Sequence, residues 1–343
     1  MPRYVDALLR EAAQYGREVI DTVYIGGGTP SLLPAPLMDK LLSGLRDCFD
    51  IPEGIEWSCE ANPGTLTEEW LQAAISGGVN RLSLGMQASQ PELLKTLGRI
   101  HDFGQVAASV DIARSCGIKN LNLDLIFGLP GQTLNMWRET LDKALSLTPE
   151  HLSCYGLIPE DGTPLKDDLV AGRLALPDEA EERRMYDDTL DILSAHGYEQ
   201  YEISNFAKPG YACRHNIGYW CQVPYIGLGV SATSCLPGNG DFAYERLTNP
   251  MDLHAYLDGG RRTRERISPA DARFETMMLG LRMMQGISES CFTQMHGMTL
   301  NECYGERLRD LERRGLLSWR DGWCRLTRRG MDVQNAILVE LME

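Results

Sequence analysis

The sequence has ten cysteines but no closely spaced pair among them. None of the ten lies within four residues of another, so the chain has neither a C-x-x-C pair nor the ligand spacing of a zinc finger. Scattered cysteines in an acidic chain are typical of reduced thiols, most of which serve as small core residues. The N-terminal residues also lack the apolar region of a signal peptide. Together these features predict a cytoplasmic protein.

Long apolar runs and an excess of basic charge are missing as well. No hydrophobic stretch reaches the ~18 residues of a transmembrane helix, so we expect no membrane span. The chain carries 33 Lys and Arg against 48 Asp and Glu, a net charge of −15. This balance disfavours binding to nucleic-acid phosphates and to anionic membranes. The length of 343 residues suffices for one large domain and a smaller one.

The first half of the chain alternates strand and helix patterns. It opens on an amphipathic helix near Tyr4. Strand patterns then cover residues 22–25, 55–62, 79–86, 121–126 and 151–158. Helix patterns follow them at 32–49, 67–75, 91–97, 103–116 and 134–147. Alternation at this spacing predicts a parallel β/α sheet or barrel.

Polar residues recur at the ends of these predicted strands. They are Thr29, then Glu60 with Asn62, then Gln87, Asp124 and Glu160. Because parallel strands end on one rim and ligands bind there, these side chains predict a binding site.

The first strand runs into the glycine turn Gly26–Gly28. Residues without Cβ let backbone amides approach an anionic group closely at the start of a helix. A plain turn between a strand and a helix is the alternative, because a lone glycine cluster is a weak signal.

The second half is less regular. We expect a helix over 177–195, a strand or hairpin arm over 197–206, and an aromatic, loop-like stretch over 208–240. Long loops are commonly functional. From about residue 267 the pattern is helices at 269–284 and 301–314, a hairpin at 316–327 and a helix at 328–342, as in a winged-helix unit. The arginines of the second helix alternate with acidic residues, which favours a solvated face over a DNA-reading one.

Six motifs, taken together and in order, resemble the oxygen-independent coproporphyrinogen III oxidase family of radical S-adenosylmethionine (SAM) proteins. They are G-G-G-T-P at 26–30, E-A-N-P at 60–63, R-L-S-L-G-M-Q at 81–87, L-G-R-I-H at 97–101, G-L-P-G-Q-T at 128–133 with Asp124, and Y-E-Q-Y-E-I-S-N-F at 198–206. The stretch Cys213–Trp220 resembles the H-N-x-x-Y-W motif of the heme-chaperone branch, HemW, rather than the oxidases.

This resemblance implies an α/β fold with three segments. They are a partial, TIM-like (β/α) barrel over 1–206, a connecting aromatic region over 207–266 and a C-terminal helical domain over 267–343. It implies a heme chaperone that binds heme and SAM and delivers heme to an apo-hemoprotein. Coproporphyrinogen III oxidation and a cluster-less SAM-binding module are the alternatives. The open edge of the first strand would invite self-association, so a homodimer is also among the expected partners.

The resemblance also implies roles for individual residues toward SAM. Gly27, Gly28 and Thr29 would meet its amino and carboxylate groups, and Arg99 would pair with the carboxylate. Glu60 would bind the ribose hydroxyls, and Gln87 and Asp124 polar groups of the ribose or the methionine. Ile158 would lie near the adenine and contact it through its backbone. A helix cap or buried ion pair is the alternative role for Asp124, and a surface salt bridge that for Arg99.

For heme, the resemblance implies His215 as the iron ligand, because a neutral imidazole binds iron well. Tyr219 and Trp220 would pack on the macrocycle. Cys213 is a rival axial ligand, and a plain surface histidine is the alternative reading of His215.

One departure from the family pattern concerns iron. The family carries a C-x-x-x-C-x-x-C segment after its first strand, whose thiolates hold a [4Fe–4S] cluster. This sequence opens on a helix without that segment, and no other cysteines have its spacing. We therefore expect no cluster ligands and no reductive SAM cleavage by this chain alone. The sequence would be a truncated gene model, a fragment or a cluster-less descendant.

Overall fold

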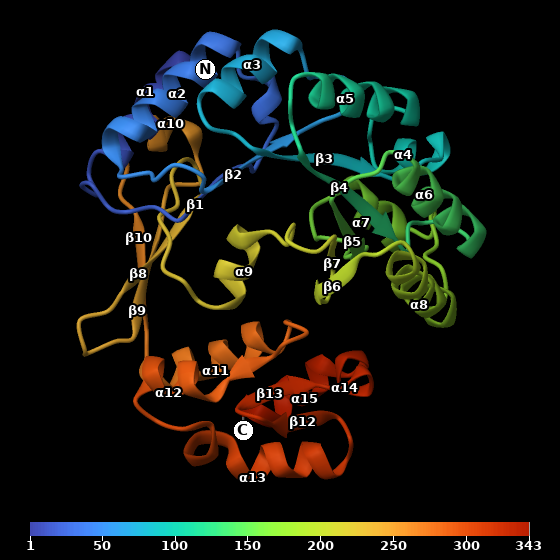
Figure 1. Cartoon of the computed structure of the whole chain (residues 1–343), viewed down its shortest axis with the longest axis vertical. Helices are drawn as coiled ribbons and strands as arrows, with labels where there is room; N and C mark the ends of the chain where they lie inside the picture. The colour runs from blue at the N-terminus through green and yellow to red at the C-terminus, as the bar shows by residue number, and fades with distance from the viewer. Residues whose placement is uncertain (343) are drawn as a thin grey trace. The chain divides into compact units, whose positions relative to one another are not determined.

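The structure is a computed structural model that describes residues 1–342 and divides into two compact units (Figure 1). Unit 2 comprises residues 17–200 and 204–212 and contains most of the large sheet. Unit 1 comprises residues 1–16, 201–203 and 213–343. The three predicted segments, with boundaries after residues 206 and 266, stay a prediction.

The large sheet has seven strands in the order β1-β2-β3-β4-β5-β7-β6. Strands β1 to β5 run parallel to one another, and β7 pairs with β5 in the antiparallel direction. This confirms the predicted partial, TIM-like barrel. The strands are β1 (Thr22–Ile25), β2 (Glu56–Ala61), β3 (Arg81–Gln87), β4 (Asn120–Phe127), β5 (His151–Gly156), β6 (Glu199–Glu202) and β7 (Asn205–Ala207).

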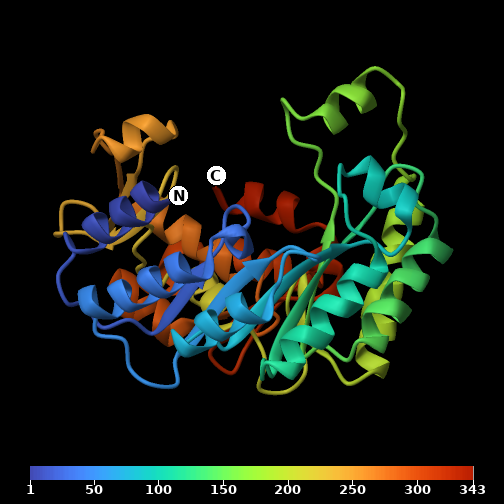
Figure 2. The same cartoon turned by 90° about the horizontal axis from the view of Figure 1, so that it is seen from above.

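Helices cover the outer face of this sheet (Figure 1). They are α2 (Ala35–Cys48), α3 (Glu68–Ser76), α4 (Pro91–Thr96), α5 (Phe103–Ser115), α6 (Leu134–Ser146) and α8 (Glu179–Ala195), with a short 3₁₀ turn η1 (Pro30–Leu32). The hydroxyl of Thr67 caps α3 as predicted, accepting from the Trp70 N–H at 3.2 Å. Figure 2 shows α7 (Pro164–Val170) on a loop that projects beyond the strand ends.

The two faces of the sheet differ in polarity because side chains alternate along each strand. Apolar residues such as Trp57, Leu82 and Leu123 are buried in the core. The alternate positions on β2, β3, β4 and β5 are polar and hydrogen-bond across the strands, as Ser83 and Asn122 do at 2.7 Å. When both faces of a parallel sheet are covered by helices, its strands have nearly continuous apolar sequences. The strands of this sheet do not. The polar inner face therefore marks the side on which a ligand can bind.

Unit 1 joins the N-terminal helix to the C-terminal third of the chain. It contains α1 (Pro2–Ala12), α9 (Arg214–Trp220) and α10 (Leu253–Leu257), with an antiparallel sheet of β8 (Thr233–Pro237), β9 (Tyr244–Thr248) and β10 (Thr263–Ile267). Its last part holds α11 (Pro269–Gly280), α12 (Glu289–His296), α13 (Leu300–Arg313), α14 (Arg328–Asp332) and α15 (Gln334–Met342), with the strands β11 (Ile287–Ser288), β12 (Leu317–Arg320) and β13 (Trp323–Leu326).

The predicted hairpin near residue 321 is confirmed. Asp321 and Gly322 connect β12 to β13 with φ of 55° and 77°, the positive angles of a type I′ turn. Arg314 pairs with Glu340 at 2.6 Å and Arg313 with Asp310 at 2.9 Å. Their pairing agrees with the prediction of a solvated face.

Two local predictions were wrong. The stretch 208–240 is not a plain loop, because α9 and β8 lie within it. The final helix is interrupted at Val333, whose φ of −123° and ψ of 26° lie outside the helical region, so α14 and α15 are separate. None of the helices in residues 1–342 combines the length and hydrophobicity that a membrane-spanning segment needs.

Candidate functional site

A pocket of about 490 Å³ opens at the carboxyl ends of β1 to β5. We call it the strand-end pocket. Its volume falls within the range of small-molecule sites. It is lined by Tyr24, Gly28, Thr29, Glu60, Ala61, Asn62, Ser83, Gly85, Gln87, Arg99, Asp124 and Tyr155.

Glu60 anchors one side of the strand-end pocket. Its carboxylate accepts from the Tyr24 hydroxyl at 2.7 Å and from the Gly27 N–H at 3.1 Å. Gly27 has φ of 87°, so only a residue without Cβ turns the chain here without strain. Burial, followed by the nearby Glu60 charge, raises the pKa of Tyr24, so the phenol stays protonated and donates.

The next strand end is shaped by Gln87, which has φ of 63° at a β-bulge after Gly85. A Cβ at position 85 would lie 2.7 Å from the Gln87 side-chain nitrogen. Glycine at 85 therefore makes room for this amide. Alongside, Asn62 donates to the Thr29 hydroxyl at 2.9 Å, which fixes the threonine after the glycine turn.

Asp124 lies at the opposite side of the strand-end pocket on a buried polar network. Its two oxygens accept from Ser83 at 2.7 Å and from Asn122 at 2.9 Å. The Asn122 side-chain oxygen lies 2.6 Å from His151 Nδ1. Burial, and then the charge of Arg81, depress the pKa of His151 well below its usual value. The imidazole is therefore neutral near pH 7.

The structure brings together six of the eight residues predicted for SAM: Gly28, Thr29, Glu60, Gln87, Arg99 and Asp124 line the strand-end pocket. Gly27 adjoins it through its bond to Glu60. Ile158 does not line it and is 82% exposed. The reason is that β5 ends at Gly156, so the chain has already left the sheet toward α7.

Tyr24, Ser83 and Tyr155 were not singled out from the sequence, although all three line the strand-end pocket. The feature of the sequence that could have identified them is the alternation of side chains between the two faces of each strand. Ser83 and Tyr155 each occupy an inner-face position, two residues from a polar neighbour on the same strand, Arg81 and Ser153 respectively.

The second candidate site is α9 in unit 1. The rings of His215 and Tyr219 lie edge to face with centroids 4.9 Å apart, and Tyr219 meets Tyr225 at 4.8 Å. Tyr219 is 39% exposed. Burial, and then Tyr225, raise the pKa of Tyr219, so it is a neutral phenol. Cys213, the rival ligand, is fully buried at the start of α9 and is poorly placed for a surface ligand.

Trp220 lies one residue beyond Tyr219 and has a different environment. The guanidinium carbon of Arg282 lies 4.5 Å from its ring centroid. One ring face is therefore already covered by protein.

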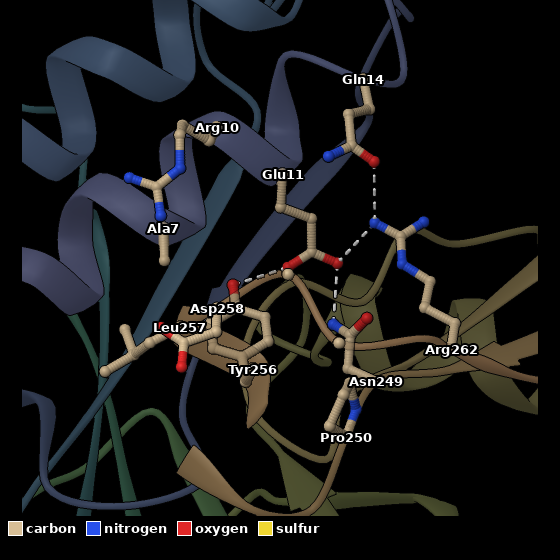
Figure 3. Close-up of a pocket in the computed structure, with 12 residues that line it drawn as sticks. Ala7, Arg10, Glu11, Gln14, Asn249, Pro250, Tyr256, Leu257, Asp258 and Arg262 are labelled. Atoms are coloured by element: carbon tan, nitrogen blue, oxygen red, sulfur yellow. Dashed lines mark hydrogen bonds and ion pairs between the residues drawn. The ribbon is translucent and has the colours of Figure 1, made fainter. Parts of the chain in front are cut away.

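A second pocket, of about 300 Å³, lies within unit 1 around Glu11 (Figure 3). We call it the Glu11 pocket. The buried carboxylate accepts four hydrogen bonds, from Gly229 N–H, Asn249, Tyr256 and Arg262, at 3.0, 2.7, 2.7 and 3.1 Å. A carboxylate offers about four acceptor positions, so this one is saturated.

No three His, Cys, Asp or Glu side chains in residues 1–342 gather as a metal site. The cysteines near the sheet, Cys59 and Cys154, are buried, and burial raises their pKa. The described thiols thus do not fit an iron–sulfur cluster.

Sequence comparison places this chain among known proteins. The sequence model of the radical SAM superfamily matches residues 2–144, and that of the HemN C-terminal domain matches residues 267–333. The heme chaperone HemW of Lactococcus lactis is 35% identical over 99% of this chain and 89% of its own length. This chain belongs to the HemW family of the radical SAM superfamily.

Other HemW proteins agree with this assignment. That of Bacillus subtilis is 35% identical over 97% of this chain and 89% of its own length, and that of Escherichia coli is 36% identical over 86% and 78%. Among solved structures, the coproporphyrinogen III oxidase HemN of Escherichia coli superposes with a TM-score of 0.80 over 98% of this chain and 82% of its own. At 23% identity, that likeness concerns the fold alone.

Proposed function

We propose that this chain is a heme chaperone that binds heme through His215 and delivers it to an apo-hemoprotein. The observation that carries the proposal is the pairing of the half-buried His215 ring with the exposed Tyr219 ring on one face of α9, in a chain 35% identical to a HemW protein. Spaced four residues apart, both side chains point from one helix face. A neutral imidazole ligates iron, and the Tyr219 ring offers an apolar surface beside it.

Heme titration followed in the Soret band tests this proposal. We expect wild-type protein to shift the band and His215→Ala to bind about 100-fold more weakly, because removing a ligand costs at least as much as disturbing its supporting residues. His196→Ala, which removes an exposed histidine at the end of α8, is the matched control. Unchanged affinity in His215→Ala would rule out His215 as the ligand.

We further propose that the strand-end pocket binds SAM. Its polar groups suit the ligand: the Arg99 guanidinium suits the carboxylate, and the Glu60 and Asp124 carboxylates can accept from hydroxyl and ammonium groups. Each of these two carboxylates accepts two hydrogen bonds from side chains or amides of residues 1–342, which leaves acceptor positions for a ligand. Gly27, Gly28 and Thr29 would present amides and a hydroxyl, and Gln87 its amide.

Calorimetry with SAM tests the second site separately from the first. We expect binding that His215→Ala leaves intact. No heat of binding at any attainable SAM concentration would overturn the SAM proposal and leave the heme proposal standing. Ile158, which the sequence predicts to lie near the adenine, does not line the strand-end pocket.

The described residues offer no thiolate set for a [4Fe–4S] cluster. Coproporphyrinogen III oxidation remains the alternative function. The specific observation that favours it is the match of residues 267–333 to the HemN C-terminal domain. Absence of product in an anaerobic assay with coproporphyrinogen III, SAM and a reductant would count against it.

A further inference from the structure

Helix α9 rests on groups from the C-terminal part of unit 1. The Arg282 guanidinium stacks over the Trp220 ring at 4.5 Å and donates to Glu202 at 3.2 Å. Glu202 is fully buried and the Arg282 side chain is 31% exposed, so the carboxylate end of this ion pair is shielded from water. The buried indole N–H of Trp220 has no hydrogen-bond acceptor within residues 1–342. Stacking, rather than a hydrogen bond, therefore holds this ring.

The backbone fixes Arg282 from the other side. The Met284 N–H donates to the Tyr201 carbonyl at 3.0 Å, and Glu202 forms an antiparallel bridge with Met283. The segment carrying Arg282 and the segment carrying Glu202 are thus paired through main-chain atoms. The guanidinium is held before any ligand is present.

A second contact holds the end of α9. The Gln222 side chain hydrogen-bonds Thr276 of α11, and it donates to the Tyr244 hydroxyl at 3.3 Å. Thr276 in turn lies 2.8 Å from His296 of α12. Two successive anchors, at Trp220 and Gln222, therefore tie the helix to α11 and its neighbours.

The helix itself is too weak to hold its shape alone. It has seven residues, no side-chain N-cap at Cys213, and a glycine at 218. Isolated helices shorter than ~12 residues are marginal in water. The position of His215 and Tyr219 must therefore be set by the face of the helix that is anchored to the protein.

We infer that Arg282 is a positioning residue for heme binding: it clamps Trp220, with Glu202 behind it, so that α9 presents His215 in a fixed orientation. Trp220 then serves as an anchor to the protein rather than as a contact to the macrocycle. This inference rests on the proposed heme site and adds the residues that preorganise it. Preorganisation of this kind raises affinity by lowering the ordering cost of binding.

Three variants of heme-free protein give the first test. Arg282→Gln removes the stack and the charge, and Arg282→Lys keeps a charge opposite Glu202 but lacks the planar group. Arg314→Gln is the matched control, because it breaks an arginine–carboxylate pair of the same unit at Glu340. By hydrogen exchange, we expect residues 213–222 to exchange faster in Arg282→Gln, less so in Arg282→Lys, and at the wild-type rate in Arg314→Gln. Equal exchange in all four proteins would overturn the clamp.

Heme titration of the same proteins gives the second test. We expect Arg282→Gln to weaken heme binding about 10- to 100-fold, the cost typical of residues that orient a metal ligand. Arg282→Lys should lie between it and the wild type. The bound spectrum should change in Arg282→Gln, because a misplaced imidazole alters the iron environment. Trp220→Phe, which retains a stacking ring, should lose less heme affinity than Arg282→Gln.

The outcomes separate the two proposals. If wild-type protein binds no heme, the proposed function fails, whereas the exchange test still decides whether Arg282 clamps α9. If His215→Ala loses heme and both Arg282 variants bind with wild-type affinity and spectrum, only the positioning role fails. If Arg282→Gln does not fold, Arg282→Lys and Trp220→Ala decide, since both leave a cation beside Glu202.

Discussion

The strand-end pocket and the Glu11 pocket are both polar, but their carboxylates differ in how many protein donors they accept. Glu11 accepts four hydrogen bonds from other residues of unit 1. Figure 3 shows those from Asn249, Tyr256 and Arg262. Glu60 and Asp124, in unit 2, accept two each from the described residues. A saturated carboxylate holds the fold together, whereas a half-satisfied one at a strand end can still bind a ligand.

The largest expected difference comes from breaking the saturated carboxylate. Glu11→Ala removes the buried carboxylate that Arg262 and Asn249 share as an acceptor, and removing one member of a buried pair costs about 3–5 kcal/mol of unfolding free energy. Urea unfolding of the variant measures this. Asp258→Asn, which removes an exposed partner of Arg3, should change stability by less than about 1 kcal/mol. A stable Glu11→Ala protein would remove the distinction between the two pockets.

The next change concerns the strand-end pocket. Asp124→Asn keeps the shape of the side chain but removes its charge, and hydrogen bonds to charged groups are worth about 1.5–3 kcal/mol. We expect SAM affinity to fall about 10- to 100-fold, with little loss of stability, in calorimetry and urea unfolding. Asp111→Asn, on the exposed face of α5, is the control. If SAM affinity held and stability fell instead, Asp124 would be a structural residue like Glu11.

The third prediction uses pH. The pKa of His151 is lowered in the folded protein, so below its ordinary value of about 6.5 only the unfolded chain takes up the proton. Stability should be unaffected above pH 7 and fall by up to about 1.4 kcal/mol per pH unit below 6.5.

His101 and His296 add to this trend, because burial lowers their pKa too. His151→Gln should reduce the slope of unfolding free energy between pH 6.5 and 5.5 without abolishing it. If the unfolding free energy of His151→Gln had the same slope against pH as the wild type, the buried network beside Asp124 would not keep His151 unprotonated in the folded protein.

The smallest expected effect compares two adjacent glycines in the turn. Gly27→Ala places a side chain at φ of 87°, which costs about 1–2 kcal/mol. Gly28→Ala has no such strain and open space around its Cβ, so its stability should change by less than about 0.5 kcal/mol. Thermal unfolding of the two variants measures the difference. Equal melting temperatures would show that the turn adapts.

The strand-end pocket could be predicted well from sequence. The period-two pattern of β2 and β3 decides which side chains share a face, and parallel topology brings consecutive strand ends to one rim. Glu60, Gln87 and Asp124 therefore meet wherever those strands pair. The adenine contact of Ile158 stays a prediction: this residue follows the end of β5 at Gly156, and the point at which a strand ends depends on how the chain leaves the sheet, which local pattern does not encode.

The sequence by itself thus determined the sheet, its helices and the polar rim, since these follow from short-range periodicity. Only the tertiary structure decided the helix α9, the Trp220–Arg282 stack and the four bonds to Glu11. Trp220 and Arg282 are far apart in sequence, and Glu11 meets partners more than 200 residues away. Such contacts stabilise elements that are weak in isolation, so no local pattern reveals them.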